Sequence, residues 1–132
     1  MKYLLFLPLI FLLFLSLRGG VDLQNQEDYE VYSYSRRMPT REEVKATVFK
    51  DELYLAKELI KRESGDNPMA VNPTSGAAGV PQALPPDKMG CELSQDIQDY
   101  ICQVKWMAEE YIPKRYGSVK AALDFHTQHG WY

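Results

Sequence analysis

The chain has 132 residues, which suits one domain, and its 45% hydrophobic and 25% charged residues are typical of a globular protein. Its formal net charge of −3 disfavours binding to nucleic acids, because that function needs basic patches. The sequence holds no G-x-S-x-G, HExxH, P-loop or CxxC motif, so we expect neither a bound metal ion nor a cofactor.

Residues 1–20 have the pattern of a secretory signal. Residues 3–17 carry no charge, and Lys2 and Arg18 flank them. We expect a cleaved signal peptide, with a retained membrane anchor as the alternative, because this segment is short for a spanning helix and Pro8 interrupts it. In either case the rest of the chain is extracytoplasmic or secreted. Cleavage would remove two positive charges and no negative one, so the net charge would go from −3 to −5.

Residues 21–40 are predicted to be a linker, with a short extended piece around Tyr29 to Tyr34, and residues 41–132 to be the domain. The first helix is predicted to run to about Arg62. Thr40 with Glu43 fits a capping box, and Gly65 is a typical stop. Apolar residues recur along one helical face at Val44, Val48, Leu55 and Leu59, with Phe49, Ala56 and Ile60 beside them.

Residues 64–90 contain five prolines and four glycines, which exclude a long regular element. A loop of this length in a compact domain is usually functional or disordered. We expect it to be ordered, because it also carries apolar residues that can be buried: Met69, Val71, Val80, Leu84 and Met89. Short helical turns are expected over residues 79–83 and 86–89.

Two further helices are predicted after the loop. Ser94 is placed to cap the first of them, and Pro113 is expected to end it. Its apolar residues recur at helical spacing, at Ile97, Ile101, Val104, Ala108 and Ile112. Gly117 and Ser118 precede a shorter helix that runs through Phe125. No segment alternates with the period of a strand, so the predicted fold class is mostly α.

Cys91 and Cys102 are the two cysteines of the chain. In an oxidising compartment an even number favours a disulfide, which would pin the loop onto the following helix and stabilise a small domain. The alternative is a pair of buried free thiols.

Glu63 is the residue with the clearest potential for catalysis. It ends an apolar helical face and directly precedes the loop, where exclusion of water would raise the pKa of its carboxyl and keep it protonated as a general acid. Glycoside cleavage is a reaction that needs such an acid. From position alone, a solvated surface glutamate is the alternative. His126 and His129 could be two metal ligands, but no third ligand is evident, so we expect them to pack or to cap near the C-terminus.

Several ordered motifs occupy the second half of the chain. They read ESGDNPMA from Glu63, GAAGVPQ from Gly76, ALP from Ala83, CQVKW from Cys102, RYGS from Arg115 and HGWY from His129. This order resembles the signature of bacterial lytic transglycosylases of the soluble SLT type, whose domain is similar to goose-type lysozyme. It is most similar to a short exported branch that includes proteins like the aggregation-promoting factors. The resemblance covers about residues 50–132.

The resemblance implies a small lysozyme-like domain with a long, ordered active-site loop. It implies that Glu63 is the single catalytic acid, that Ser64 helps to orient the substrate, and that Gly79 and Gln82 line the groove. Trp131 and Tyr132 could stack on a sugar, with core packing as the alternative. Larger members carry an A-x-N-A-G motif where this chain reads ALDFH over residues 122–126.

The expected function is therefore cleavage of peptidoglycan glycan strands by a monomer. The family cuts the β-1,4 bond between N-acetylmuramic acid (MurNAc) and N-acetylglucosamine (GlcNAc) and leaves 1,6-anhydro ends. One alternative is a lysozyme-type hydrolase of the same bond. The other is a cell-surface protein that binds the wall or promotes aggregation without catalysis.

Overall fold

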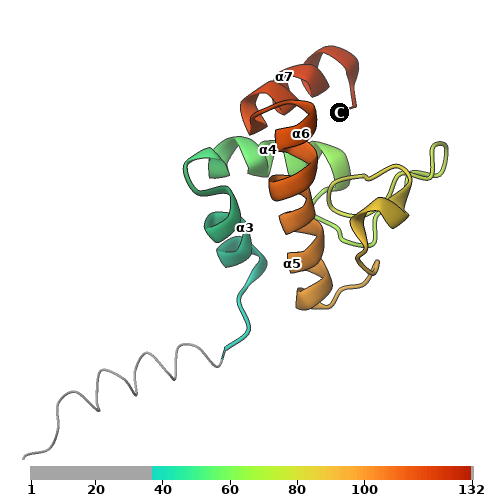
Figure 1. Cartoon of the computed structure of the whole chain (residues 1–132). Coiled ribbons are helices and arrows are strands. Elements are labelled where there is room, and N and C mark those ends of the chain that lie inside the picture. The colour runs from blue at the N-terminus through green and yellow to red at the C-terminus, as the bar shows by residue number, and fades with distance from the viewer. Residues whose placement is uncertain (1–36, 132) are drawn as a thin grey trace, which may run out of the picture. The chain divides into compact units, whose positions relative to one another are not determined.

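The computed structural model describes residues 37–131 (Figure 1). The predicted signal or anchor segment, nearly all of the predicted linker and Tyr132 lie outside the described residues. The residues from Pro39 onward belong to one compact unit. The described part of the chain is mostly helical, as predicted, and none of its helices is long and apolar enough to cross a membrane.

The first predicted helix is in fact two helices, α3 (Arg41–Phe49) and α4 (Leu53–Ser64), joined by the 3-10 turn η1 (Lys50–Glu52). The predicted capping box is present: the N–H of Glu43 donates to Thr40 Oγ1, and the N–H of Thr40 donates to the Glu43 carboxylate. The chain turns at Lys50, where φ is +48°. The prediction of one continuous helix was therefore wrong. Because α3 and α4 bury their apolar faces in the same core, the apolar residues keep helical spacing across the bend and conceal it.

A contact from a distant helix holds this bend. Glu52 Oε1 accepts a hydrogen bond from the N–H of Val119, at 3.1 Å. Val119 begins α7 (Val119–His129), so the carboxylate of η1 satisfies one of the free N–H groups at that helix start. The turn at Lys50 is thus stabilised by tertiary structure, which local sequence does not encode.

The loop after α4 is ordered, as predicted. Gly65 ends α4 in the left-handed conformation. Isolated antiparallel β-bridges pair Ala78 with both Val71 and Ala83, and the 3-10 helix η2 (Pro86–Met89) follows, as expected. Residues 79–82 form a tight turn rather than the helical turn expected there, because the bridge partners on either side require the chain to reverse.

The next helix begins as α5 (Ile97–Lys105), and its N-cap is Asp96 rather than Ser94. The N–H of Gln98 donates to Asp96 Oδ1 at 2.7 Å, whereas the Ser94 hydroxyl donates to the carboxylate of Asp99. The predicted cap lies two residues too early because the chain is still extended at Asp96, and the helix begins only after it.

This helix continues past Pro113, which was expected to end it. It passes through the π-helical segment η3 (Trp106–Tyr111) into α6 (Ile112–Arg115). At their junction the N–H of Ile112 donates to the carbonyl of Met107, five residues back. Pro113 then lies in the first turn of α6, where its missing N–H is tolerated.

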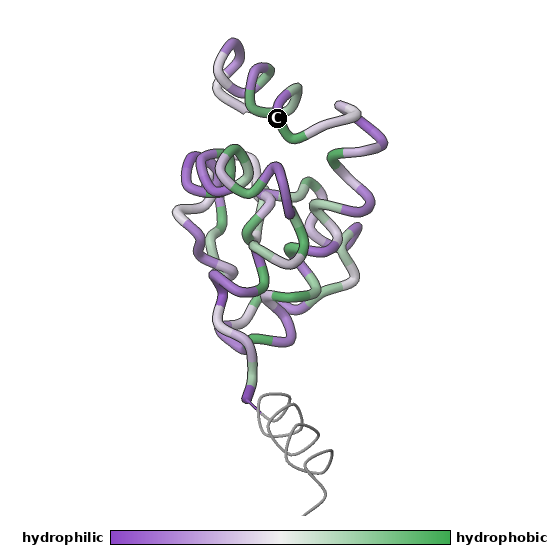
Figure 2. Tube along the Cα trace, turned by 90° about the vertical axis from the view of Figure 1, so that its left-hand side faces the viewer, coloured by the Kyte–Doolittle hydropathy of each residue, from purple (hydrophilic) through white to green (hydrophobic). Residues whose placement is uncertain are grey.

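The core lies where these helices pack together. Helix α7 begins after Gly117 and Ser118, as predicted, and the Ser118 hydroxyl caps it. It packs against α4, and α3 packs against α5. Figure 2 shows hydrophobic residues (green) recurring at intervals along the helical turns. The core residues come from every α-helix, from η3 and from the loop: Val44, Phe49, Ala56, Leu59, Ile60, Val80, Tyr100, Val104, Met107, Ile112, Val119 and Ala122.

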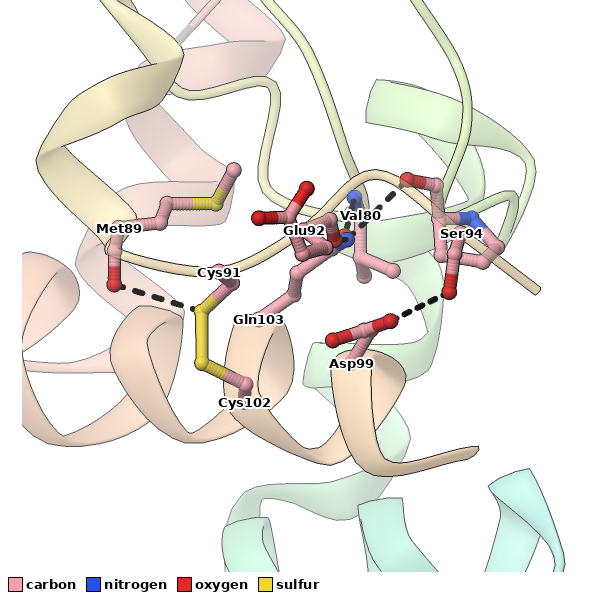
Figure 3. Close-up of a disulfide and its surroundings, with 9 residues drawn as sticks. Val80, Met89, Cys91, Glu92, Ser94, Asp99, Cys102 and Gln103 are labelled. Carbon is pink, nitrogen blue, oxygen red and sulfur yellow. Dashed lines mark hydrogen bonds between the residues drawn. A yellow bond between two sulfur atoms is a disulfide. The ribbon is translucent and has the colours of Figure 1, made fainter. Parts of the chain in front are cut away.

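Cys91 and Cys102 form the predicted disulfide (Figure 3). Cys91 follows η2 and Cys102 lies within α5, with their Cα atoms 5.8 Å apart. The bond therefore fastens the end of the long loop to the helix that supports it.

Replacing both cysteines by serine is expected to lower the free energy of unfolding by about 3 kcal/mol. The reason is that the disulfide closes a short loop, with a sequence separation of 11, and so restricts the unfolded chain. Urea unfolding of the double variant and of the oxidised and reduced wild type measures this effect. Reduced wild type should match the variant; equal stability of the variant and the oxidised protein would contradict the prediction.

Candidate active site

Glu63 lies in the last turn of α4, immediately before the loop. Its side chain is only 8% exposed, and its Oε1 atom is buried without a hydrogen-bond donor among residues 37–131. Helix α7 packs on α4 and covers the carboxyl with His126. Because buried polar atoms are normally hydrogen-bonded, this arrangement is costly. The alternative of a solvated surface glutamate is therefore wrong.

Burial raises the pKa of the Glu63 carboxyl to about 7. The adjacent Arg62 does not bind this carboxyl: its guanidinium binds Glu58 at 2.9 Å and Thr127 at 3.0 Å. With no paired cation, removal from water disfavours the carboxylate form. Near neutral pH this carboxyl can thus both give and accept a proton, which is the property of a general acid and base.

His126 of α7 lies directly against Glu63. Its Nε2 is 3.2 Å from Glu63 Oε1, although the contact is not aligned as a hydrogen bond, and its side chain is 13% exposed. Its Nδ1 is also buried without a partner among the described residues. Burial, and then the charge of Arg62, lower the pKa of His126 below its ordinary value. This pairing was not predicted, because it joins residues 63 positions apart in the chain.

His129 behaves as expected from the sequence. Its ring stacks on Phe125, and its Nδ1 lies 2.9 Å from the Phe125 carbonyl, so it packs near the end of α7. No group of three or more His, Cys, Asp or Glu within residues 37–131 is arranged to hold a metal ion.

The other residues predicted to contact substrate make hydrogen bonds within the protein. Ser64 Oγ donates to the carbonyl of Ile60 at 3.4 Å. Gly79 has φ of +78°, and its carbonyl accepts from Gln82 Nε2 at 3.0 Å. Gln82 Nε2 also reaches the carbonyl of Ala70, at 3.3 Å, and Gln82 itself has φ of +48°. These residues fix the shape of the loop beside Glu63, and their contact with substrate stays a prediction.

Gln103 of α5 organises this loop, a role that its sequence position did not predict (Figure 3). It is fully buried, and its Oε1 accepts from the N–H of Val80 at 2.8 Å. Its Nε2 donates to the carbonyls of Pro68, at 3.1 Å, and Glu92, at 2.8 Å. A Cβ on Gly79 would come within 2.7 Å of Gln103 Oε1, so the glycine allows the loop to approach the helix.

Trp131 is half exposed and joins a cluster of aromatic rings. Its ring meets Phe125 edge-on, with centroids 5.0 Å apart, and the guanidinium of Arg115 lies 5.6 Å from its centre. Arg115 also lies over the rings of Tyr111 and Tyr116. The exposed part of Trp131 leaves stacking on a sugar as a prediction, and Tyr132 lies outside the described residues.

Two surface cavities lie among the described residues. One, of about 640 Å³, is lined by Lys88 of η2 and by residues of η3 and α6: Trp106, Glu110, Tyr111, Lys114 and Arg115. The other, of about 410 Å³, is lined chiefly by α4, with Lys57, Glu58 and Lys61 among its residues. Glu63 lines neither of these two cavities.

Asp66, a second acid close to Glu63 in sequence, is fully engaged. Its Oδ2 pairs with the buried Lys45 at 2.7 Å, and its Oδ1 accepts from the hydroxyl of Tyr100 at 2.6 Å. Arg41 also binds its backbone carbonyl, at 3.2 Å. Asp66 therefore ties the loop to α3 and α5, and each of its carboxylate oxygens already has a partner in the protein.

The raised pKa of Glu63 predicts a dependence of stability on pH. Its folded value of about 7 lies above the ordinary 4.5, so the folded protein keeps a proton that the unfolded chain has lost. The resulting stabilisation is complete below pH 4.5 and disappears as pH rises through 7. From pH 5 to pH 8, the wild type should therefore lose on the order of 2 kcal/mol relative to Glu63→Gln.

Urea unfolding of both proteins across this pH range measures the difference. Glu109→Gln, which changes an exposed acid, should follow the wild type. Parallel stability curves for wild type and Glu63→Gln would show that Glu63 titrates as an ordinary surface acid.

Comparison with protein-family models, with curated proteins and with solved structures finds no match to this chain. A functional assignment therefore rests on the geometry of the site and on the ordered sequence motifs.

Proposed function

We propose that the chain is a peptidoglycan lytic transglycosylase with a lysozyme-like domain, in which Glu63 is both acid and base. The observation that carries this proposal is the buried Glu63 carboxyl, whose Oε1 has no donor among the described residues and whose pKa rises to about 7. Such a group holds a proton at neutral pH and can still lose it. The ordered motifs from Glu63 to Gln82 support the same assignment.

The proposed reaction has two steps. In the first, the Glu63 carboxyl donates its proton to the glycosidic oxygen, the C1–O bond of MurNAc breaks, and the GlcNAc side leaves as an alcohol. The carbonyl of the MurNAc N-acetyl group stabilises the positive charge at C1. In the second, the Glu63 carboxylate accepts the proton of the C6 hydroxyl as that oxygen bonds to C1. The product is a 1,6-anhydro ring, no water is consumed, and Glu63 regains its proton.

A single carboxyl suits this reaction better than it suits hydrolysis by two acids. Both oxygens of Asp66 are occupied by Lys45 and Tyr100. Asp87 lies on η2 and is exposed to solvent, and no described contact singles it out as a base. The groups that would replace a second carboxylate, the N-acetyl carbonyl and the C6 hydroxyl, both belong to the substrate.

The side chains that line the cavity of about 640 Å³ are of the kinds that bind a glycan bearing acidic groups. The rings of Trp106 and Tyr111 stack with centroids 5.1 Å apart, and aromatic faces bind the apolar faces of sugars. Lys88 and Arg115 add positive charge around these rings, whereas Lys114 is paired with Glu110. The lactyl and peptide carboxylates of peptidoglycan match that charge, so we assign glycan strands as the partner.

An extracytoplasmic location accords with the disulfide. Disulfides persist in oxidising compartments, and Cys91–Cys102 is present in the domain. We therefore propose that the domain acts at the cell wall, outside the cytoplasm.

Product analysis tests this function directly. Purified peptidoglycan incubated with the full chain is expected to release fragments that end in 1,6-anhydro-MurNAc, which mass spectrometry identifies by the loss of one water from the reducing end. Reducing ends in place of anhydro ends would instead identify a lysozyme-type hydrolase. Binding to the wall without any released fragment would identify a wall-binding protein.

A further inference from the structure

His126 has two features that simple packing does not explain. Its Nε2 lies 3.2 Å from Glu63 Oε1, and both that oxygen and its own Nδ1 are buried without hydrogen-bond partners among residues 37–131. Packing alone favours an apolar side chain at such a position, because each buried polar atom without a partner is costly. Nε2 and Oε1 lie close enough to form a hydrogen bond with each other.

The environment of His126 decides its protonation state. An imidazolium carries N–H donors on both nitrogens, and Nδ1 has no described acceptor. Arg62, on the helix that carries Glu63, adds a positive charge that disfavours a second cation. The imidazole is therefore neutral, with one N–H. Placing it on Nε2 allows donation to Glu63, whereas placing it on Nδ1 would bury an unpaired donor.

We propose that His126 is a positioning residue for Glu63: its neutral imidazole donates the Nε2 proton to Oε1 and leaves the other carboxyl oxygen for the substrate. The inference rests on the proposed function and names the residue that controls its acid. Catalytic hydrogen bonds are often poorly aligned without substrate and tighten only in the working site, so we expect the His126 ring to align with Oε1 there. The bond is strongest to the carboxylate, so His126 stabilises the base form that the second step requires.

The other charged groups around the pair are accounted for. On α4, Arg62 is held by Glu58 and Thr127, and Lys61 is exposed. On α7, Asp124 pairs with Lys120, and His129 packs on Phe125. After α6, the ring of Tyr116 packs on Phe125, and burial raises its pKa to about 12, so it stays neutral. Arg115 lies over aromatic rings.

The tautomer of His126 can be read in the unmodified protein. Long-range ¹H–¹⁵N correlation spectra of the full chain at pH 7, with His126→Gln to assign the signals, distinguish a protonated Nε2 from a protonated Nδ1. We expect a neutral ring protonated on Nε2. A ring protonated on Nδ1, or on both nitrogens, would overturn the proposal, and neither result depends on enzymatic activity.

A matched set of variants tests the effect on Glu63. His126→Phe keeps a ring but removes the donor, His126→Gln keeps an N–H donor, and His129→Phe makes the same change at an exposed site of the same helix. The ¹³C titration of the Glu63 carboxyl should move up by about one pH unit in His126→Phe, because the carboxylate loses a charge-assisted hydrogen bond. It should stay near the wild-type value in the other two. An unchanged or lowered midpoint in His126→Phe overturns the proposal, and so does a shift of equal size in His129→Phe.

The failure of this inference can be told from the failure of the proposed function. If glycan cleavage depends on Glu63 but its titration ignores His126, the positioning role is wrong and the function stands. If the tautomer and the titration are as expected but no glycan is cleaved, the contact is real and the proposed reaction is wrong. In an active enzyme, His126→Phe should lower kcat about tenfold with little change in KM, and His126→Gln should restore most of it.

Discussion

Glu63→Gln is expected to slow the cleavage of peptidoglycan strands at least about a hundredfold, because an amide cannot donate the proton that the leaving oxygen needs. Glutamine matches glutamate in shape, and it removes an ionisable group from a site where only 8% of the side chain is exposed. The fold should therefore persist. The rate of release of anhydro fragments from purified wall, together with binding to the same wall, measures the two properties separately.

A matched control separates the role of Glu63 from a general loss of negative charge. Glu109→Gln makes the same substitution at an exposed position of η3 and should cleave at the wild-type rate. If Glu63→Gln retained wild-type cleavage, the catalytic assignment would be wrong. If neither protein cleaved and both bound the wall equally, the domain would be a wall-binding protein that keeps its glutamate for another reason.

The parts of the structure that the sequence predicted are encoded by short-range signals. The capping box of Thr40 and Glu43, the stop at Gly65 and the helix start after Gly117 and Ser118 each act within one helical turn. The pairing of Cys91 with Cys102 followed from their being the chain's two cysteines. Burial of Glu63 was one of two alternatives that its position left open, and the contact with His126 of α7 decides between them.

The parts that the sequence did not predict depend on contacts between distant segments. The bend at Lys50 is held by Glu52 and Val119, and the passage through Pro113 depends on a π-helical segment before it. The pairing of His126 with Glu63 had one local signal: His126 lies seven and four residues after the buried Val119 and Ala122, on the inward face of α7. That spacing shows that the ring points inward but does not identify what it meets.

The buried face of α5 also differed from the predicted one. Val104 and Ile112 are buried as predicted, but Ile97, Ile101 and Ala108 are only half-buried. The fully buried positions of α5 and the following η3 are Tyr100, Gln103, Val104 and Met107. These four residues recur at i, i+3, i+4 and i+7, which is as good a helical stripe as the apolar one. This stripe is hard to recognise in the sequence, because two of its four residues, Tyr100 and Gln103, carry polar groups. Their partners in the loop explain why polar side chains occupy this face.

Gln103→Leu is expected to lower the free energy of unfolding by about 4 kcal/mol, because it leaves several buried backbone groups without partners. Leucine fills a similar volume but makes none of the bonds that Gln103 makes to Val80, Pro68 and Glu92. The N–H of Val80 would then be buried with no acceptor. A loss of this size is a large share of the stability of a small domain. Urea unfolding measures the loss, and hydrogen exchange at the Val80 amide reports which contact has failed.

In Gln103→Leu, the loop should lose protection from hydrogen exchange before the helices do. Val80 lies between Gly79 and Gln82 in the tight turn, so release of its N–H frees the segment that those two residues shape. Protection of the Val80 amide should fall more than that of amides in α4. Gln128→Leu, the same substitution at an exposed position of α7, should change neither quantity appreciably. A Val80 amide that stays protected in Gln103→Leu would mean that the disulfide and the β-bridges hold the loop without the glutamine, and that Gln103 fills space rather than organising the site.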